Sequence, residues 1–501
     1  MGRSLGFTSS GIWMAVGLLA SILIWFLPWR FQVNDDEVMM WLVSGAYTGV
    51  PESYAVFIHP VLTGFFSLLY TWFSGIAWYA LTWFALIFLS YAVFIRFVHQ
   101  KMGTKPQGLV WKFLLLAALI HFTFFLQFSI VSAFCISAGL VNRLGLSQNT
   151  EKARLQILNT DLLVLMGILI RWEVGVVLIG ASLGFLLVFG KGKNLIRAGW
   201  IPVTLLVMVG LSHVLLEKSS DLDQFSKINK LRSQVFDHPM LQLHKEHWEE
   251  KEQELFHFSN GLQDFTAGNL EEKQLLEWKD LLDSSRSELL SPEFFLQAWV
   301  SFVQHEHFFL FLLVASLFLT ILSRDNAVNW SLILIFLGLN FLIPFYLLKI
   351  QVFALVFFLM ITLVLISDGG VSKVQPNIYH VMSGILILGI AWHMVSIFSS
   401  EKNIPDNNEI KETLSELHGQ GLSDIYLIGE SKWYHSLVFE NPLPFKVLGW
   451  PSLLEFHKNE NPSSKRGFLV QNKTFFPNES YFQTGKPKIE FLEEFVLITY
   501  P

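Results

Sequence analysis

Cysteine is almost absent from this chain: Cys135 is the only one among 501 residues. A single thiol cannot form an intramolecular disulfide or a cysteine metal cluster, so the fold depends on neither. The sequence also has no glycine-rich phosphate loop, no Cys/His spacing typical of a metal centre, no coiled coil and no internal repeat. Function must therefore be sought in less familiar patterns.

Charged residues are also scarce, at 15% of the chain, whereas 52% of it is hydrophobic and 47 residues are Phe. This composition is too apolar for an ordinary water-soluble protein. Apolar stretches of about 18 to 22 residues, the length that crosses a hydrocarbon layer of roughly 30 Å, recur along the chain. We therefore expect a mainly α protein, a polytopic transmembrane bundle of about eleven spans. The predicted spans are Ile12–Pro28, Ile76–Val98, Leu109–Gln127, Ser129–Leu146, Ile157–Ile170, Val174–Phe189, Trp200–Leu216, His305–Leu322, Val328–Leu347, Ile350–Ser367 and Ile378–Phe398.

The distribution of cations predicts how the bundle is oriented. No small-residue cleavage pattern follows the first span, so we expect it to be retained as an anchor. Lys and Arg near span ends are held on the cytoplasmic side, and the basic loops share one side if the N-terminus is inside. The style of the chain suggests a bacterial inner membrane. The net charge of −6 averages over both sides and says little about partners, and we expect no nucleic acid among them.

The spans and the polar segments between them divide the chain into four predicted parts. Residues 1–217 form a transmembrane module, 218–304 an extracytoplasmic helical cap, 305–398 further transmembrane helices, and 399–501 a small extracytoplasmic α/β domain. Apolar residues at helical spacing in LEEKQLLEWKDLLDSS predict amphipathic helices in the cap. A helix at Glu409–Leu417 and the runs DIYLIG, GFLVQN and FVLITY predict the α/β domain.

One apolar stretch, Ala55–Phe73, is predicted not to cross. It contains HPVLTGFFSLLYTWFSG, whose bulky and small groups alternate as in a helix that lies in the membrane interface. If it crossed, the basic loop at Arg96 would face outward, on the opposite side of the membrane from the other basic loops. A re-entrant segment or a true span is the alternative.

An acidic triplet, Asp35, Asp36 and Glu37, follows the first span and precedes the apolar run VMMWLVSGAYTG. Neighbouring carboxylates in a partly dry cavity raise each other's pKa toward that of a usable base, or share a divalent cation such as Mg or Mn if one is present. Glycosyl transfer needs such a base to take the acceptor's proton. The alternative is that the triplet only caps the aqueous end of a helix.

Three charged residues interrupt apolar segments on the same predicted side. Arg171 and Glu173 lie in the turn between two spans, and Lys349 lies in an apolar hairpin. Charges at such depth are expensive and tend to be functional. Pairing of Arg171 with Glu173 for purely architectural reasons is the alternative.

The order of these elements resembles the type C glycosyltransferase superfamily (GT-C), in particular the protein O-mannosyltransferases and the aminoarabinose transferases of lipid A. In those enzymes an acidic pair in the first outer loop precedes a proline-containing segment and an aromatic amphipathic helix, to which DDEVMMW and HPVLTGFFSLLYTWFSG are similar. The sequence departs from the pattern at His59 and Pro60, where a charged residue and two prolines are usual. The resemblance covers about the first 190 residues.

The resemblance implies an enzyme that moves a sugar from a polyprenyl-phosphate donor, with inversion, to a glycan, lipid or protein acceptor outside the cytoplasm. Asp35 or Asp36 would be the general base, and Glu37 would assist or bind a metal. Arg171 and Lys349 are the candidates for the lipid phosphate, with Glu173 beside them.

Further candidates have a stronger structural alternative. His59 could touch the same cavity or simply pack, Arg232 in the cap could bind donor or acceptor or lie on a solvated helical face, and Trp450 in the tail could stack on a sugar or fill a small core. Two other classes of function compete with a transferase. A lipid-linked sugar transporter or flippase would be expected to show paired halves, which are not visible here, and a noncatalytic scaffold would use the cap and tail for protein contacts.

Overall fold

The structure is a computed structural model. It describes residues 9–145, 151–188, 192–218, 222–243, 245–259, 272–322, 326–346, 350–366, 375–400, 407–428, 445–447, 449–453, 465–470, 488–492 and 496–499. Lys349, one of the predicted phosphate ligands, lies outside these ranges.

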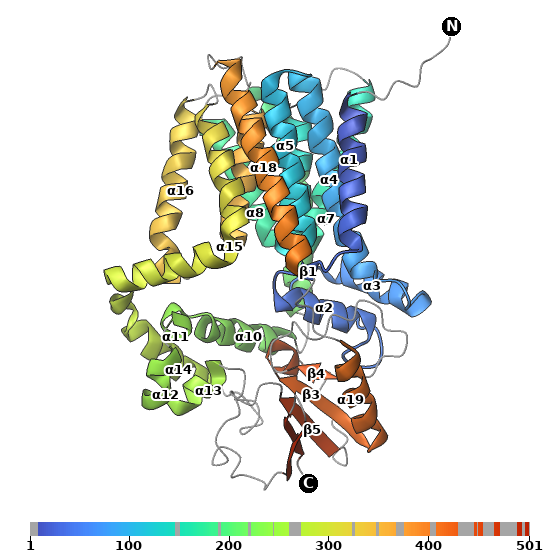
Figure 1. Cartoon of the computed structure of the whole chain (residues 1–501), viewed down its shortest axis with the longest axis vertical. Helices are drawn as coiled ribbons and strands as arrows, with labels where there is room; N and C mark the ends of the chain where they lie inside the picture. The colour runs from blue at the N-terminus through green and yellow to red at the C-terminus, as the bar shows by residue number, and fades with distance from the viewer. Residues whose placement is uncertain are drawn as a thin grey trace.

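A bundle of apolar helices forms the larger part of the molecule, drawn in the upper half of Figure 1. Every predicted span corresponds to a helix of this bundle. Within the described ranges, five helices are long and apolar enough to cross a membrane, and the other bundle helices have shorter apolar stretches. This confirms the predicted mainly α membrane fold. The bundle helices are α1 (Ser9–Trp25), α4 (Trp78–Met102), α5 (Pro106–Phe124), α6 (Phe128–Gly145), α7 (Glu151–Ile170), α8 (Trp172–Val188), α9 (Gly192–Lys218), α15 (Pro292–Ile321), α16 (Asn326–Tyr346), α17 (Ile350–Ile366) and α18 (Pro376–Ser400).

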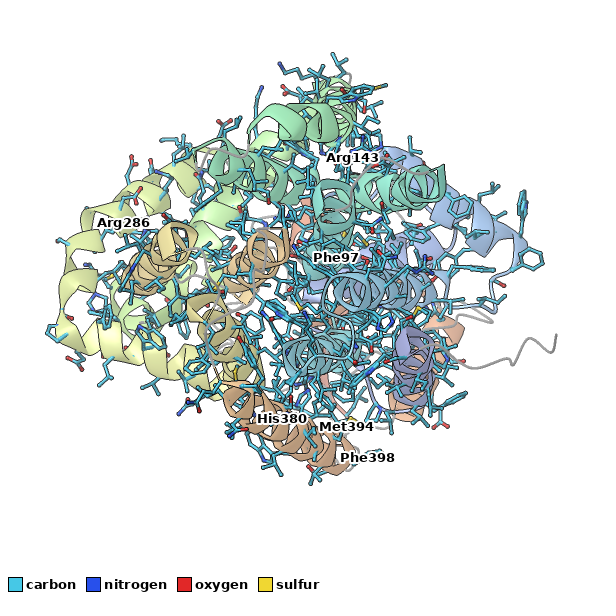
Figure 2. The ribbon with its side chains drawn as sticks, turned by 90° about the horizontal axis from the view of Figure 1, so that it is seen from above. Phe97, Arg143, Arg286, His380, Met394 and Phe398 are labelled. Carbon is cyan, nitrogen blue, oxygen red and sulfur yellow. The ribbon has the colours of Figure 1, made fainter. Side chains whose placement is uncertain are left out.

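The interior of the bundle is closely packed. Seen from above, the helices surround an interior that contains Phe97, whereas Phe398 projects from α18 at one edge (Figure 2). Helices α6 and α7 approach each other through glycine, since a Cβ on Gly139 would come within 2.9 Å of the Thr160 carbonyl oxygen. In a membrane, apolar side chains contact lipid as favourably as they contact another helix, so helices associate through close packing. Small residues such as glycine allow this close packing. This contact fixes α6, which begins at Phe128, against α7, which ends directly before Arg171.

Two short helices lie at one end of the bundle. Helix α2 (Asn34–Ser44) carries the acidic triplet, and α3 (Pro60–Trp72) lies within the predicted interfacial segment. Figure 1 shows α3 at the base of the bundle, across its long axis. Its 13 residues span only about 20 Å, too short to cross a membrane. Along its outward face, Val61, Phe65 and Trp72 are more than half exposed, as expected for a helix at an apolar interface.

A two-stranded parallel pair links the start of the chain to the middle of the module. Strand β1 (Arg30–Phe31) follows α1, and β2 (Phe125–Leu126) follows α5. The pair places the turn before α6 beside the segment that leads into α2. It therefore brings residues about 90 positions apart to the same end of the bundle.

Helix α15 changes direction at Glu306, whose φ of −126° and ψ of 29° are not helical. In Figure 1 its first half lies across the end of the bundle and its second half runs along it. A span beginning at His305 was predicted from the sequence, and the break occurs one residue later. The first half packs Phe294 against the cap core and Ala298 in the bundle core, and the apolar second half runs along the bundle.

The cap and the C-terminal domain both lie beyond the end of the bundle that holds α2 (Figure 1). The cap has its own core, centred on Trp248, Trp278 and Leu282. The predicted amphipathic segment in it is helix α14. The cap elements are α10 (Leu222–Phe236), α11 (Pro239–Leu243), α12 (Lys245–Lys251), α13 (Gln253–Ser259), α14 (Glu272–Ser284) and the 3-10 helix η2 (Arg286–Leu290).

The C-terminal domain is a small mixed sheet with one helix, which confirms the predicted α/β fold. The strand order is β4-β3-β5-β7-β6. Strand β3 is parallel to β4 and β5, and β7 is antiparallel to β5 and β6. The three predicted runs form β3, β5 and β7, and the sequence did not indicate β4 or β6. The elements are α19 (Asn407–Gly419), β3 (Leu422–Ile428), β4 (Lys446–Val447), the 3-10 helix η5 (Trp450–Leu453), β5 (Lys465–Val470), β6 (Lys488–Phe491) and β7 (Val496–Thr499).

Candidate active site

The acidic triplet forms the first turn of α2. The residue before the helix, Val33, has no side chain that could cap it, so the negative charges of the first turn face the positive end of the helix dipole. Asp36 has no exposed surface and Glu37 is 3% exposed, while Asp35 is partly exposed. A triplet that only capped the aqueous end of a helix would be solvated. The burial therefore disfavours that alternative.

Both carboxylate oxygens of Asp36 accept hydrogen bonds. Oδ1 accepts from the Tyr79 hydroxyl at 2.8 Å and from Trp83 Nε1 at 3.3 Å, and Oδ2 accepts from the backbone N–H of Phe128 at 3.0 Å. Burial raises the pKa of Asp36 to about 8, and the charge of Asp35 adds to the rise, while the hydrogen bonds oppose it. Asp36 thus joins the start of α2 to α4 and α6, and presents no exposed surface to a substrate.

Asp35 faces the C-terminal domain. Trp450, the first residue of η5, donates from Nε1 to Asp35 Oδ1 at 3.0 Å. The Trp450 ring also packs against Phe57, with 6.2 Å between ring centroids. Sugar stacking and core packing were the two interpretations of Trp450 from the sequence, and neither anticipated this hydrogen bond. Other contacts between this domain and α2 are the ring pair Trp41–Phe445, with centroids 4.9 Å apart, and the hydrogen bond from the Tyr47 hydroxyl to the Val447 carbonyl oxygen at 3.4 Å.

The turn between α5 and α6 lies next to two guanidinium groups. Arg30 Cζ is 5.0 Å from the centroid of the Phe125 ring, and Arg171 Cζ is 5.1 Å from that of the Phe128 ring. The backbone N–H of Phe128 is the same group that binds Asp36. One residue, Phe128, therefore contacts both the buried acid of the triplet and the predicted phosphate ligand. The sequence did not single out Arg30, although it is a cation that directly follows the first span.

Arg171 is held at this position by aromatic and polar contacts. It donates to the Ser129 hydroxyl, and its Cζ lies 5.8 Å from the centroid of the Phe57 ring. Its side chain remains 27% exposed, so part of the guanidinium faces open space. The separation of 3.9 Å between Arg171 Nε and Glu173 Oε2, with the Glu173 side chain 54% exposed, describes a weak surface pair. The functional and the architectural interpretations of this pair both stay predictions.

Gln127 is a polar residue of this region that the sequence did not indicate. Its side chain has no exposed surface, and neither its amide nitrogen nor its amide oxygen has a hydrogen-bond partner among the described residues. It directly precedes Phe128. Leaving a buried amide unpaired costs about 1 to 3 kcal/mol, so the position has a reason other than stability.

The remaining predicted site residues lie elsewhere. His59 caps α3, because its Nδ1 accepts from the Val61 N–H at 3.3 Å, and its Nε2 lies 2.9 Å from Ser212 Oγ. Burial lowers the pKa of His59, and the neighbouring ring of His213 lowers it further. On α10 the Arg232 guanidinium lies over the ring of Phe236 of the same helix, at 5.7 Å. Substrate contacts of His59 and Arg232 stay predictions.

A second group of polar side chains lies on the Arg30 side of the turn. Gln32 donates to Glu306 Oε1 at 2.6 Å, at the break in α15, and His121 Nδ1 lies 3.2 Å from His393 Nε2 inside the bundle. The sequence signal that could have indicated this group is the charge of Glu306 at the start of a predicted span. These residues tie α5, α15 and α18 to the segment that leads into α2.

Metal binding was expected only if a divalent cation were shared by the triplet. Among the residues that the structure describes, no group of three His, Cys, Asp or Glu side chains is placed to hold a metal ion. Both oxygens of Asp36 accept hydrogen bonds from the protein, and Asp35 and Glu37, two positions apart on a helix, point in different directions. The described donors therefore do not fit a shared cation.

No protein-family model matches the chain, and no curated protein matches it either. Two solved structures are similar to it: ArnT from Cupriavidus metallidurans bound to undecaprenyl phosphate, and the same protein in the apo state. Each aligns over 98% of this chain and 98% of the other, with 12% sequence identity and a TM-score of 0.44. At this level of similarity, function has to be argued from the chain's own residues.

Proposed function

We propose that this integral membrane protein is an inverting glycosyltransferase that moves a sugar from a polyprenyl-phosphate donor to an acceptor, with Asp35 as the general base. The observation that carries the proposal is that one ring, Phe57, lies between the hydrogen-bond partner of an acid and a cation. Trp450, which binds Asp35, packs against this ring, and Arg171 lies 5.8 Å from its centroid. A base and a cation near one aromatic surface are what glycosyl transfer from a lipid phosphate requires.

The two aspartates are assigned different roles because their surroundings differ. Asp36 has no exposed surface and accepts three hydrogen bonds, so it positions α2. Asp35 is partly exposed on the adjacent position. A general base must come within hydrogen-bond reach of the proton that it removes, which favours Asp35. Glu37, buried on the same turn, stays a predicted helper of the reaction.

In the proposed reaction the Asp35 carboxylate removes the proton from a hydroxyl or amine of the acceptor. The acceptor atom forms its bond to the anomeric carbon as the bond from that carbon to the phosphate oxygen breaks. The polyprenyl phosphate leaves with the negative charge, and the guanidinium of Arg171 stabilises that charge. Attack from the side opposite the leaving phosphate inverts the anomeric carbon.

The location of the site supports a donor with a lipid tail. The triplet, α3 and Arg171 lie at the end of an apolar bundle, where α3 exposes apolar side chains. A phosphate at that level, with its isoprenoid chain among the helices, would reach Arg171 without leaving the membrane. We propose that this end of the bundle lies outside the cytoplasm, because the described cations Arg96, Lys101 and Arg143 lie toward the other ends of α4 and α6. The proposed membrane is a bacterial inner membrane.

The experiment that tests the proposal uses the purified full-length protein in lipid vesicles with a polyprenyl-phosphate sugar carrying a radiolabel on the sugar. We expect transfer to an acceptor or slow hydrolysis, which Asp35→Asn abolishes. The matched control is Asp223→Asn, which changes an exposed acid paired with Lys227 in the cap. Movement of the intact donor across the vesicle without bond cleavage would instead indicate a transporter, and the absence of both would indicate a scaffold. Either outcome overturns the proposal.

A further inference from the structure

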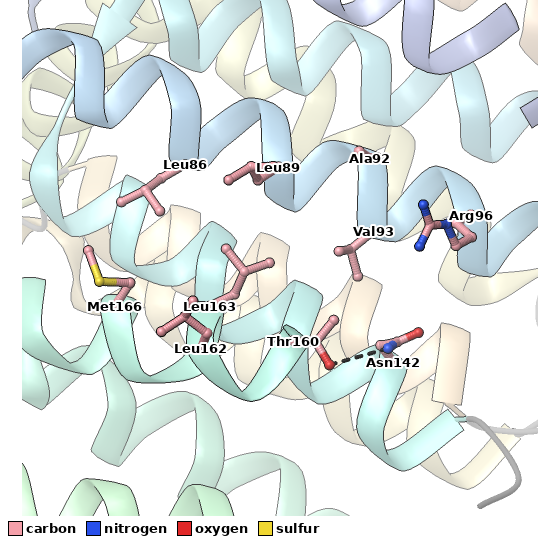
Figure 3. Close-up of a pocket in the computed structure, with 10 residues that line it drawn as sticks. All are labelled: Leu86, Leu89, Ala92, Val93, Arg96, Asn142, Thr160, Leu162, Leu163 and Met166. Carbon is pink, nitrogen blue, oxygen red and sulfur yellow. Dashed lines mark hydrogen bonds between the residues drawn. The ribbon is translucent and has the colours of Figure 1, made fainter. Parts of the chain in front are cut away.

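A groove runs along the outside of the bundle between α4 and α7, and Figure 3 shows the residues that line it. It encloses a cavity of about 250 Å³. Most of its lining is aliphatic, as at Leu89, Val93 and Met166. Leu89 is 48% exposed and Leu162 is 60% exposed, as expected for side chains that face lipid instead of the protein core.

One end of the groove is polar. Asn142 Nδ2 donates to Thr160 Oγ1 at 3.2 Å, which closes this end by joining α6 to α7. Arg96 is exposed beside them, and within the described ranges it has no ion pair or hydrogen bond. The neighbouring cation Arg143, by contrast, donates to Asp161 at 2.7 Å. Arg96 is therefore the cation that remains available to a ligand in the groove.

The groove is separate from the candidate active site. Helix α4 begins beside the acidic triplet, where Tyr79 binds Asp36. Arg96 lies 17 positions further along the same helix, which at the rise of an α-helix is about 25 Å. The polar end of the groove is thus near the opposite end of the bundle, at the level where lipid headgroups of that leaflet would lie.

We propose that the groove binds an anionic glycerophospholipid, with one acyl chain along the aliphatic lining and the phosphodiester on Arg96. The charges match, because one guanidinium neutralises the single negative charge of a phosphodiester in a charge-assisted pair. A phosphate monoester carries about −1.5 to −2 at neutral pH, which would leave charge without a partner. The lipid site is independent of the proposed transferase activity.

The test is native mass spectrometry of the full-length protein, titrated with phosphatidylglycerol or with phosphatidylcholine of the same chains. We expect one phosphatidylglycerol to be retained in preference to phosphatidylcholine. Arg96→Gln should weaken its retention about fivefold, the effect of roughly 1 kcal/mol per cation near a lipid headgroup. Lys105→Gln, a change of an exposed cation at the same end of the bundle but outside the groove, is the matched control and should leave retention unchanged.

A second variant tests the groove without changing charge. Ala92→Phe places a ring in the aliphatic lining, and we expect it to weaken retention of phosphatidylglycerol while the protein stays folded and keeps its transferase activity. Equal retention by wild type, Arg96→Gln and Ala92→Phe would overturn the proposal. Preference for phosphatidylcholine, or for a polyprenyl phosphate over phosphatidylglycerol, would overturn it as well.

Discussion

Trp450 and Asp35 are 415 positions apart in the sequence, yet the indole N–H of Trp450 donates to Asp35 Oδ1 at 3.0 Å. The C-terminal domain therefore reaches the acid that we propose as the general base. The same indole packs against Phe57, beside which Arg171 lies. The orientation of the base thus depends on a domain that lies outside the transmembrane bundle.

Replacement of Trp450 by Phe tests this dependence. An aromatic contact with Phe57 is kept, while the N–H and part of the volume of the buried indole are lost. Because hydrogen bonds to charged groups contribute about 1.5 to 3 kcal/mol, we expect turnover to fall at least about tenfold. Thermal unfolding should show a moderate loss of stability, because phenylalanine fills less of the buried space that Trp450 occupies. Trp392→Phe, at an exposed position of α18, is the control, and an equal loss in both variants would contradict the role of Trp450.

The pKa of Asp36 predicts how stability depends on pH. Its pKa is about 8 in the folded protein, compared with 3.8 as the ordinary value, so the folded state binds an extra proton between these limits. The contribution of Asp36 to the free energy of unfolding therefore decreases as pH rises from about 4 to 8. Asp36→Asn removes this titration and leaves the Phe128 N–H without its carboxylate.

Thermal unfolding in detergent at pH 5, 7 and 9 would measure both effects. We expect Asp36→Asn to be less stable than wild type at pH 5, because a buried N–H loses its acceptor at a cost of about 1 to 3 kcal/mol. The difference between the two proteins should become smaller toward pH 9. Parallel curves at all three pH values would show that Asp36 does not titrate in this range.

Two substitutions of Arg171 separate the effect of its positive charge from the effect of its planar guanidinium group. Arg171→Gln should reduce kcat/KM by about a hundredfold or more, because the leaving phosphate loses its charge-assisted partner. Arg171→Lys keeps the charge but not the planar group that stacks on two aromatic rings, so we expect only partial recovery. Glu173→Gln, at the exposed end of the weak pair, should change kcat/KM little. Full activity of Arg171→Gln would remove this residue from the site.

Replacement of Gln127 separates a role in substrate binding from a role in stability, because the two roles predict different changes in KM and in unfolding temperature. Gln127→Leu removes one amide, whose nitrogen and oxygen have no hydrogen-bond partner among the described residues, so we expect the unfolding temperature to stay the same or rise. If the amide binds substrate next to Phe128, KM for the donor should increase in the same variant. The kinetics of Gln127→Leu and its thermal unfolding check this together. A loss of stability without a change in KM would show that the amide is a structural element.

The sequence predicted the parts of the molecule whose signal is local. Apolar runs indicated the bundle, the spacing in LEEKQLLEWKDLLDSS indicated α14, and the alternation of bulky and small groups in HPVLTGFFSLLYTWFSG indicated α3. The acidic triplet was recognisable because acids directly precede an apolar helix. In each case neighbours along the chain determine the structure, so periodicity and composition are sufficient.

The sequence could not predict the contacts that form the site. Asp36 accepts hydrogen bonds from Tyr79, from Trp83 and from a backbone N–H, and no residue pattern reveals these three donors. Trp450 belongs to another domain, and Gln127 is distinguished only by burial. Glu306, at the break of α15, accepts a hydrogen bond from Gln32, which lies 274 positions away in the sequence. These features arise between elements that are distant along the chain, where local propensity carries no information.

The central claim is that Asp35 acts in the chemical step and not in donor binding. The direct test is a single-turnover measurement of sugar transfer by Asp35→Asn, together with the affinity of the same variant for the polyprenyl-phosphate donor. We predict an affinity within about twofold of wild type and a transfer rate at least about 10² lower, the usual contribution of a positioned base. A wild-type transfer rate in Asp35→Asn would contradict the account.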